Sequence, residues 1–289
     1  MATPVFSDNI LRREVKRLAQ QKSSFAKYIN TEYSGELQGK SSIVFVPVMS
    51  NITLTGSNIT GASGMTLGTG PGQAISPTDT TLSLEPIKLS KYSNYLERIT
   101  DFQVKHSKVP LEQAIGENLA TAKDVLLDNF VRDLILVDKI ASIPAANKIN
   151  SGTPIAIATG TVIEVFGKCT VALDKQNAGM DRVCFVSAEV ADVYQRAQLL
   201  TNTEMGAEML QAGYLGRYRG TPIVYSAALN ASNEMVMMEK GTVHAVVEDY
   251  GTQSKDGNNG NYFNVFTEVV YGGEIFSVNL PKIAVAYFI

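Results

Sequence analysis

The sequence predicts an α+β fold, and three observations support this. Apolar residues recur at three- and four-residue steps from Leu111 to Val137, which is the period of a helix. Two β-prone runs, IVFVPV at 43–48 and TLSLEPIKL at 81–89, flank a tract that has almost no charge. Beyond residue 160, short helical and strand patterns alternate, and the chain ends in β-prone runs.

The composition indicates a folded protein without a strong electrostatic preference for one kind of partner. The chain has 289 residues, 45% of them hydrophobic, and a formal net charge of -3. This charge argues against a nucleic-acid binder that works through a broad basic face. No window approaches the roughly 18 apolar residues of a membrane span, so we expect a cytosolic protein. The two cysteines, Cys169 and Cys184, are predicted to be buried thiols in a reducing compartment.

The first predicted element is a short amphipathic helix over residues 7–21. Leu11, Val15 and Leu18 share one side of it, at helical spacing. The other side is basic and consists of Arg12, Arg13, Lys16 and Arg17. A solvated helix face and a contact with nucleic acid or membrane all fit this pattern.

The tract between the two β-prone runs, Asn51–Thr81, contains a single charge, Asp79. Apolar residues are scattered through its Gly, Thr and Ser residues: Ile52, Leu54, Ile59, Met65, Leu67 and Ile75. A free linker with this composition would expose apolar surface to water. The flanking runs therefore predict a long β-hairpin that lies on another surface, since so long a hairpin is unstable alone.

The strongest helical pattern begins at Pro110 and is closed by Pro144, which predicts a helix of about 45 Å. Asp124, Asp128 and Arg132 follow at successive four-residue steps on one face. Two neighbouring carboxylates could act as general acid and base. An acidic pair followed by a base on a helix is more often a solvated ladder of ion pairs, and we expect that here.

The second half of the chain predicts short helices and strands. Thr161 and Glu164 form a possible capping box at a helix start. RVCFVS at 182–187 predicts a buried strand, AEVADVYQRAQ at 188–198 a helix, and GRYRGTPIVYS at 216–226 one arm of a hairpin. YGTQSKDGNNGNY at 250–262 predicts a polar loop before the last strands.

A search for catalytic and metal-binding patterns finds none that is complete. SGELQGKS at 34–41 ends like a phosphate-binding loop, but Ser34 stands where that motif needs glycine, and a strand follows it. The two histidines, His106 and His244, have no partner motif. We therefore predict no enzyme activity and no catalytic, cofactor-binding or metal-binding residues.

The order of these elements resembles that of tailed-phage major capsid proteins, which have the Hong Kong 97-type fold. The best local matches are AGYLGRYRGTPIVYSAAL at 212–229 and NLPKIAVAYF at 279–288. The resemblance implies an N-terminal arm, an extended β-hairpin loop, a peripheral domain with a long spine helix, and a mixed α/β axial domain. The expected ranges are 1–40 for the arm, 41–90 for the extended loop, 91–145 for the peripheral domain, 146–247 for the axial domain, and 248–289 for C-terminal strands that return to the peripheral domain.

The resemblance also implies a function and partners. It implies a structural protein that assembles into hexamers and pentamers of an icosahedral shell around a double-stranded DNA genome, with portal and scaffolding proteins as further partners. Its expected location is the virion, after assembly in the bacterial host cytoplasm. Alternatives are the shell of an encapsulin-like compartment, a phage surface or tail protein, and an unrecognised enzyme.

Some relatives join a lysine of the extended loop to an asparagine of a neighbouring subunit. This sequence has no lysine between Lys40 and Lys88. Both of these lysines lie at the base of the predicted loop. We therefore predict no covalent cross-links between subunits.

Overall fold

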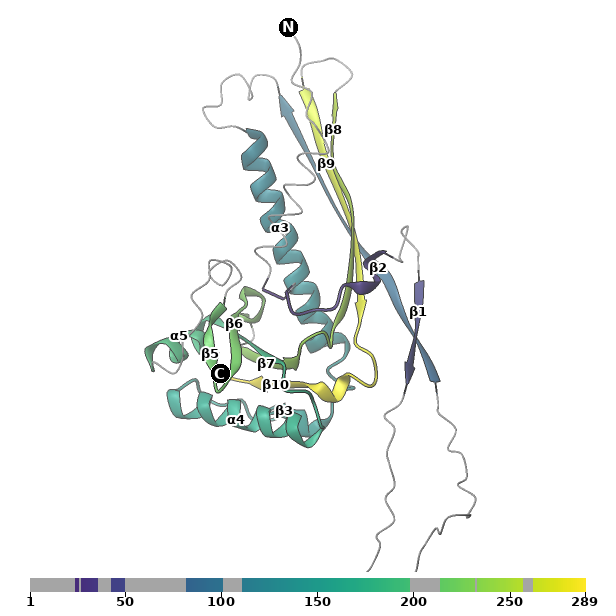
Figure 1. The fold of residues 1–289 in the computed structure, drawn as a ribbon. Helices are drawn as coiled ribbons and strands as arrows, with labels where there is room; N and C mark the ends of the chain where they lie inside the picture. Colours follow the sequence, from purple (N-terminus) through teal and green to yellow (C-terminus); the bar gives the residue numbers. More distant parts are fainter. Residues whose placement is uncertain are drawn as a thin grey trace, which may run out of the picture.

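The structure is a computed structural model, and it describes residues 24–25, 27–35, 43–49, 82–100, 111–197, 214–231, 233–256 and 262–289. The predicted helix at 7–21 with its four basic residues, the uncharged tract, Lys40 and His106 lie outside the described residues. The described part contains two β-sheets and a long helix (Figure 1), which confirms the predicted α+β class.

The first sheet has four strands in the order β1-β2-β9-β8, each antiparallel to its neighbours. Its strands are β1 (Ile43–Met49), β2 (Leu82–Thr100), β8 (His244–Asp256) and β9 (Tyr262–Glu274). At about 3.3 Å per residue, the 19 residues of β2 extend over about 60 Å. β1 pairs with the first part of β2 and β9 pairs with the rest, so β2 links the β1 hairpin to the long part of the sheet.

The second sheet has six strands in the order β3-β10-β7-β4-β6-β5. They are β3 (Lys148–Ile149), β4 (Arg182–Val186), β5 (Tyr214–Tyr218), β6 (Thr221–Tyr225), β7 (Glu234–Glu239) and β10 (Ile283–Tyr287). The central strand β4 is buried along its whole length. Val183 and Phe185 face one core cluster, whereas Cys184 and Val186 face the other.

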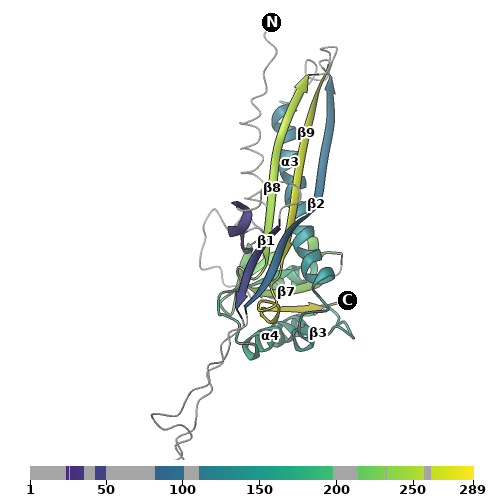
Figure 2. The same cartoon turned by 90° about the vertical axis from the view of Figure 1, so that its right-hand side faces the viewer.

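The helices cover these sheets from different sides. α3 (Leu111–Asp133), followed by a π-helical turn at Leu134–Asp138, runs along the long strands (Figures 1 and 2). α4 (Thr159–Lys175) and α5 (Ala188–Arg196) pack on one face of the six-stranded sheet. Short 3-10 helices lie at Glu32–Gly35, Ala145–Asn147, Ala227–Leu229 and Leu280–Lys282. The predicted long helix is confirmed, and no helix in the described ranges is long and apolar enough to cross a membrane.

The segment at residues 24–35 is part of the fold. The Phe25 ring is fully buried and stacks on Phe185 of β4, with 4.1 Å between the ring centroids. The Asp128 carboxylate on α3 accepts hydrogen bonds from the backbone N–H groups of Ser24 and Phe25 and from the Ser24 hydroxyl. This carboxylate therefore fixes the start of the described chain on α3.

The predicted solvated ladder on α3 is wrong. Asp124 is buried, at 7% exposure, and Asp128 receives the hydrogen bonds of residues 24–25. Arg132 bonds to Asp133 and to the carbonyl oxygen of Ala228. The helix face that the sequence shows as charged is covered by segments distant in sequence, which supply other partners.

Other predicted elements differ from the structure in detail. α4 begins at Thr159, so Thr161 stands in its first turn, and the Thr161 hydroxyl accepts the N–H of Ala158. Glu164 pairs with Lys168 instead of closing a capping box. Residues 250–256, predicted as loop, continue β8 because their backbone pairs with β9. β8 is an edge strand, where polar residues are tolerated.

The last strand lies in a different sheet from the two long strands that precede it. Residues 248–274 pair within the four-stranded sheet, but β10 pairs with β7 and β3 in the six-stranded sheet. Its residues Ile283–Ala286 are buried. A continuous apolar run of this kind fits a strand that is covered on both faces. The expected boundary at residue 90 likewise falls inside the continuous strand β2.

Candidate assembly surface

β1 and the start of β2 form the base of a hairpin with two unlike faces. The two strands pair antiparallel from Ile43 opposite Lys88 to Met49 opposite Leu82, which confirms the predicted pairing of the two runs. Side chains alternate between the faces along each strand. One face therefore turns toward the protein core and the other turns outward.

The inner face packs against the body of the molecule. Val46, Val48, Ile87 and Leu89 are buried. They form a core cluster with residues from β8, β9 and the turn after β9: Val246, Val270 and Phe276. This packing fixes the orientation of the hairpin base.

A hydrogen-bonded clamp supports the inner face. The Glu85 carboxylate on β2 accepts the backbone N–H of Ser277 at 2.9 Å and also the Ser277 hydroxyl. Glu85 belongs to the hairpin, whereas Ser277 belongs to the turn that follows β9. The contact therefore joins two segments that are 192 residues apart in the sequence.

Gly272 on β9 sets where the hairpin leaves the long sheet. A Cβ at this position would lie 1.8 Å from the carbonyl oxygen of Lys88, so only glycine allows the two backbones to approach so closely. The register of β2 against β9 shifts at the same place, between Leu89 and Lys91. Beyond it, β1 and the first part of β2 lie on the side of the molecule away from α5 (Figure 1).

The outer face of the hairpin base is apolar and exposed. Phe45 is 59% exposed, Leu84 65% and Ile43 46%. In the strand register Phe45 stands opposite Pro86, and Pro47 stands opposite Leu84. Lys88, opposite Ile43, is the charged residue at the end of this face. Contiguous exposed apolar side chains of this kind mark interaction surfaces.

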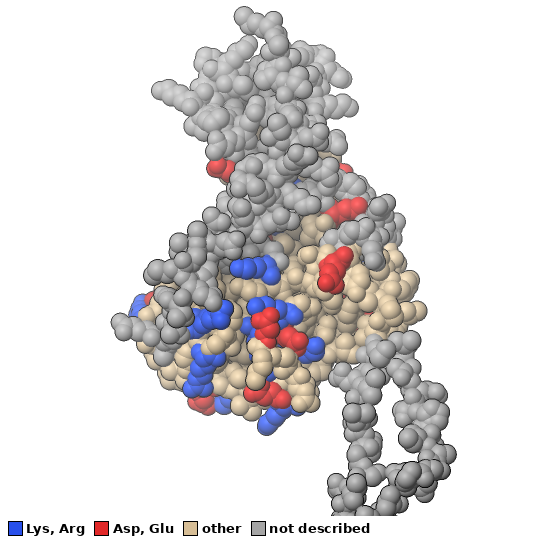
Figure 3. All heavy atoms as spheres, viewed as in Figure 1, with Lys and Arg blue, Asp and Glu red and all other residues tan. Residues whose placement is uncertain are grey.

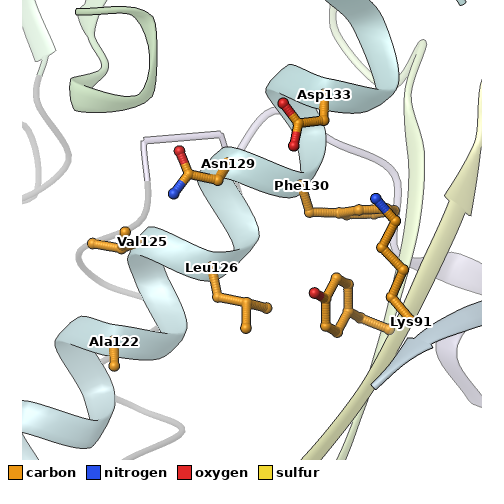
Figure 4. Close-up of a pocket in the computed structure, with 8 residues that line it drawn as sticks. Lys91, Ala122, Val125, Leu126, Asn129, Phe130 and Asp133 are labelled. Atoms are coloured by element: carbon orange, nitrogen blue, oxygen red, sulfur yellow. The ribbon is translucent and has the colours of Figure 1, made fainter. Parts of the chain in front are cut away.

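A second surface feature is a shallow groove of about 350 Å³ between α3 and the strands β2 and β9 (Figure 4). Its floor is apolar and includes Leu126 and Phe130, and Val125 on its wall is 53% exposed. The Lys91 ammonium group lies 5.4 Å from the centroid of the Phe130 ring. The groove is lined on its polar side by Asn129, Asp133 and Tyr271. These side chains suit a contact with another surface better than a reaction centre.

Of the described residues considered for chemistry in the sequence, the two cysteines lie in one core cluster and His244 lies apart from them. Cys169 on α4 and Cys184 on β4 are free thiols in the core, as predicted. Burial raises the pKa of the Cys169 thiol to about 12 and raises the pKa of Cys184 as well. His244 lies at the start of β8, in another cluster of side chains. In the described ranges, no group of three or more His, Cys, Asp or Glu side chains is placed to hold a metal ion.

The residue range that resembles a phosphate-binding loop is described only at its start. Ser34 and Gly35 end the 3-10 helix Glu32–Gly35, and the rest of 36–41 lies outside the described residues. A phosphate loop connects a strand to the first turn of a helix. The described part of this segment instead follows a turn and precedes β1.

Charged side chains on the face drawn in Figure 3 are mixed in sign. Lys and Arg side chains gather over the lower part of the molecule, where the six-stranded sheet and its helices lie, and Asp and Glu side chains stand among them. Several form ion pairs, such as Lys240 with Asp181 and Lys282 with Glu239. The described part of this face therefore mixes both signs of charge, unlike a broad basic surface that binds nucleic acid without sequence preference.

Sequence reasoning found the hairpin but not its two faces. Both sets of alternating residues in IVFVPV are apolar, so the sequence does not show which face of this strand is buried. It also missed the contact of Phe25 with β4 and the clamp between Glu85 and Ser277. The spacing of Phe25, Tyr28 and Ile29 after a basic segment was the available signal for a docked segment.

Comparisons with known proteins match this architecture over nearly the whole chain. A structure of Mycobacterium phage Che8 is 18% identical, with a TM-score of 0.64 over 92% of this chain and 91% of that one. The capsid of Ralstonia phage GP4 is 12% identical, with a TM-score of 0.59 over 93% and 92%. The chain has the fold of phage capsid proteins.

The resemblance noted in the sequence is thus confirmed at the level of the fold. A crystal structure of a virus-like particle from Pyrococcus furiosus also matches, at 12% identity and a TM-score of 0.52, over 98% of this chain and 100% of that one. No family model and no curated protein matches the sequence. The fold is therefore recognised through structure, where sequence identity is low.

Proposed function

We propose that this chain is the major capsid protein of a tailed phage, which assembles into hexamers and pentamers of an icosahedral shell around double-stranded DNA. One observation carries the proposal. On a chain with a capsid fold, the hairpin base is fixed to its own core through Val46 and Ile87 and exposes Phe45 and Leu84 on the other face. The same hairpin leads into the uncharged tract of residues 51–81.

In the proposed shell, the outer face of the hairpin base and the uncharged tract lie on a neighbouring copy. Full burial of a large apolar side chain contributes about 1.5–3 kcal/mol. Ile43, Phe45 and Leu84 together therefore supply several kcal/mol per subunit contact, and the contact recurs around every capsomer. A charge in the tract would weaken the contact between subunits, because an unpaired buried charge costs several kcal/mol.

The proposed division of the chain follows the Hong Kong 97-type arrangement. The arm is residues 1–40, the extended loop comprises β1, the tract and the first part of β2, and α3 is the spine helix of the peripheral domain. The six-stranded sheet with α4 and α5 is the axial domain. We include β10 in the axial domain, since it pairs with β7. Packaged DNA, a portal and a scaffolding protein are the further partners, and the protein acts without catalysis or cofactors.

The test compares two charged variants of the hairpin with a matched control. Phe45→Asp and Leu84→Asp place a carboxylate on the outer face. Met180→Asp makes the same change at a side chain that is 91% exposed and lies outside the hairpin, between α4 and β4. Wild-type protein and the Met180 variant are expected to form closed shells in electron micrographs, whereas the two hairpin variants stay as subunits or capsomers.

Thermal melting of isolated subunits separates assembly from folding. All three variants should melt within a few degrees of wild type, because each replaced side chain is exposed. Closed, stable shells from Phe45→Asp and Leu84→Asp would show that this face is not an assembly contact. If the wild type forms no shells under any condition, the proposed function itself is wrong.

An encapsulin-like compartment is the second candidate, and the likeness to the Pyrococcus furiosus virus-like particle over the full chain favours it. Both candidates assemble into closed shells, so the contents distinguish them. Particles purified from the native host should contain double-stranded DNA if the chain is a phage capsid protein. Particles that hold a folded enzyme and no genome would favour the compartment.

A further inference from the structure

The segment at residues 27–35 lies along the start of β8 and is held there by backbone hydrogen bonds. The N–H of Asn30 donates to the carbonyl oxygen of Val243 at 2.8 Å, and the N–H of Ala245 donates to the carbonyl oxygen of Asn30 at 3.1 Å. Asn30 thus forms a parallel bridge with His244. The two hydrogen bonds are to the residues on either side of His244, so a movement of the His244 side chain would disturb them.

The His244 ring is enclosed by aromatic side chains. It is 6% exposed, its centroid lies 4.3 Å from that of Phe276, and Tyr33 of the 27–35 segment covers it with 5.7 Å between the centroids. Its Nδ1 atom is buried and has no hydrogen-bond partner in the described part of the chain. An imidazolium ion at this place would be a charge without an acceptor for one of its two N–H groups.

The other ring nitrogen favours the neutral form, because protonation there would add a second N–H group without an acceptor. His244 Nε2 lies 3.5 Å from Nδ2 of Asn279. The same Asn279 nitrogen donates to the carbonyl oxygen of Thr242 at 3.3 Å, which fixes the orientation of the amide. Nε2 therefore faces a donor, which suits the tautomer that carries its proton on Nδ1 and accepts at Nε2. Protonation would set an N–H group against the NH₂ of Asn279.

Few charged groups face this ring. Glu32, on the 3-10 helix that carries Tyr33, stabilises the protonated form. Glu274, the register partner of His244 on β9, is paired with Lys139. On the turn after Asn279, Lys282 is paired with Glu239. Burial is the larger effect and lowers the pKa of His244 below its usual 6.5, while the Glu32 carboxylate opposes this with a smaller raising effect.

We propose that His244 and the segment Asn30–Tyr33 form an acid-sensitive latch. In neutral solution the uncharged ring stays buried under Tyr33 and the segment remains paired with β8. In mildly acidic solution the protonated ring moves to water, and Asn30 and Tyr33 separate from β8. In the sequence, the latch lies between the core residues Phe25 and Tyr28 and the strand β1. This inference concerns the single chain and does not depend on the proposed function.

The opening is local because the preceding residues are held much more strongly. Phe25 and Tyr28 pack on Phe185 in the core, and the carbonyl oxygen of Tyr28 accepts the N–H of Gly241. Extracting large aromatic side chains from a packed core is among the most costly changes to a fold. Protonation of a single histidine supplies about 1.4 kcal/mol for each unit of pKa difference. The acid therefore opens the latch without extracting Phe25 or Tyr28.

The pH range over which the latch opens follows from the direction in which the pKa of His244 is shifted. The open state has an ordinary histidine, and the closed state has a histidine whose pKa is lowered. The latch is accordingly strongest above about pH 6.5 and weakens as the pH falls below that value. The weakening ends once the pH is below the pKa of the closed state, where both states are protonated.

Hydrogen exchange on the full-length protein tests the proposal. The reporters are the amides of Asn30 and Ala245, and the amide of Gly241 is the internal control. After correction for intrinsic exchange rates, the protection of the two reporters should fall between about pH 7.5 and about pH 5, by about tenfold for each unit of lowered pKa. Protection of Gly241 should stay constant. The variant His244→Gln should lose the pH dependence of the reporters.

A second variant keeps the test independent of how well His244→Gln folds. Glu32 is exposed, and Glu32→Gln removes the charge that favours the protonated ring. The pKa of His244 in the closed state should therefore fall further, so the total loss of reporter protection in acid should be larger in this variant than in the wild type. Reporter protection that is independent of pH in the wild type, or an equal fall in His244→Gln, would overturn the latch. A joint fall at Gly241, or a loss of protection in Glu32→Gln that is equal to or smaller than that of the wild type, would also overturn it.

Discussion

At the scale of single residues, the fold depends on side chains whose partners are far away in the sequence. Phe25 stacks on Phe185, and Asp128 holds the backbone of Ser24 and Phe25. Both contacts cross more than a hundred residues of chain, and both attach the first described residues to the core. The segment before β1 is thus part of the folded subunit from Ser24 onward.

Phe25→Ala should destabilise the subunit by about 3–5 kcal/mol, because it leaves a cavity against Phe185. Equilibrium unfolding in denaturant measures this change. Lys27→Ala is the matched control, since Lys27 is exposed and in the same turn. A Phe25 variant as stable as the Lys27 variant would show that the segment is not part of the core.

The two cysteines should be unreactive toward thiol reagents in the native protein at neutral pH. Cys169 and Cys184 are fully buried, and burial raises the pKa of Cys169 to about 12. Since the pKa values in the fold lie above those of an unfolded chain, stability should fall as the pH rises above about 9. Labelling with a chromophoric disulfide, with and without denaturant, gives the readout. Rapid labelling of native protein would contradict the burial of these thiols.

At the scale of elements, the hairpin base illustrates how one strand pair serves two purposes. Its inner residues join the core of their own chain, while its outer residues remain exposed. The clamp between Glu85 and Ser277 and the close approach at Gly272 set its direction. The role of the segment between Met49 and Leu82 can be tested separately by deleting it.

Replacing residues 50–81 with a short Asn-Gly turn should leave the isolated subunit nearly unchanged. The core clusters of the described chain are built mainly from the two sheets and the helices packed on them, so the melting temperature should stay within a few degrees. Assembly should fail or give fragile shells, as sedimentation would show. Normal, stable shells from the shortened protein would mean that the tract has no part in assembly.

At the scale of the whole molecule, the two sheets and α3 form one framework that carries exposed apolar side chains at several places. Besides the hairpin base, Val125 lines the groove on α3, and Val171 on α4 is 51% exposed. Single exposed apolar side chains are common on protein surfaces, so the contiguous apolar face of the hairpin base is the feature that indicates a contact.

Shells of this protein should be held together without covalent links between chains. Lys88 is the lysine closest to the tract on its C-terminal side, and it lies on the hairpin base opposite Ile43. Mature particles boiled in denaturant and reductant should therefore run as single chains of about 31.2 kDa on a gel. A ladder of multiples would disprove this.

The sequence by itself determined the elements whose signal is local. The helix α3 follows from its 3.6-residue period, the β1 and β2 pair from two β-prone runs, and the buried strand β4 from an unbroken apolar run. The sequence also showed that no catalytic motif is complete and that the order of its elements resembles that of tailed-phage major capsid proteins.

Only the tertiary structure decided which surfaces are covered. The polar residues 250–256 are strand because β9 offers its backbone as a partner, and β10 lies in the second sheet because both its faces can be buried there. Asp128 binds residues 24–25 rather than Arg132, and the two faces of the hairpin base differ only through their neighbours. Such outcomes depend on burial by residues distant in sequence, and local periodicity carries no information about them.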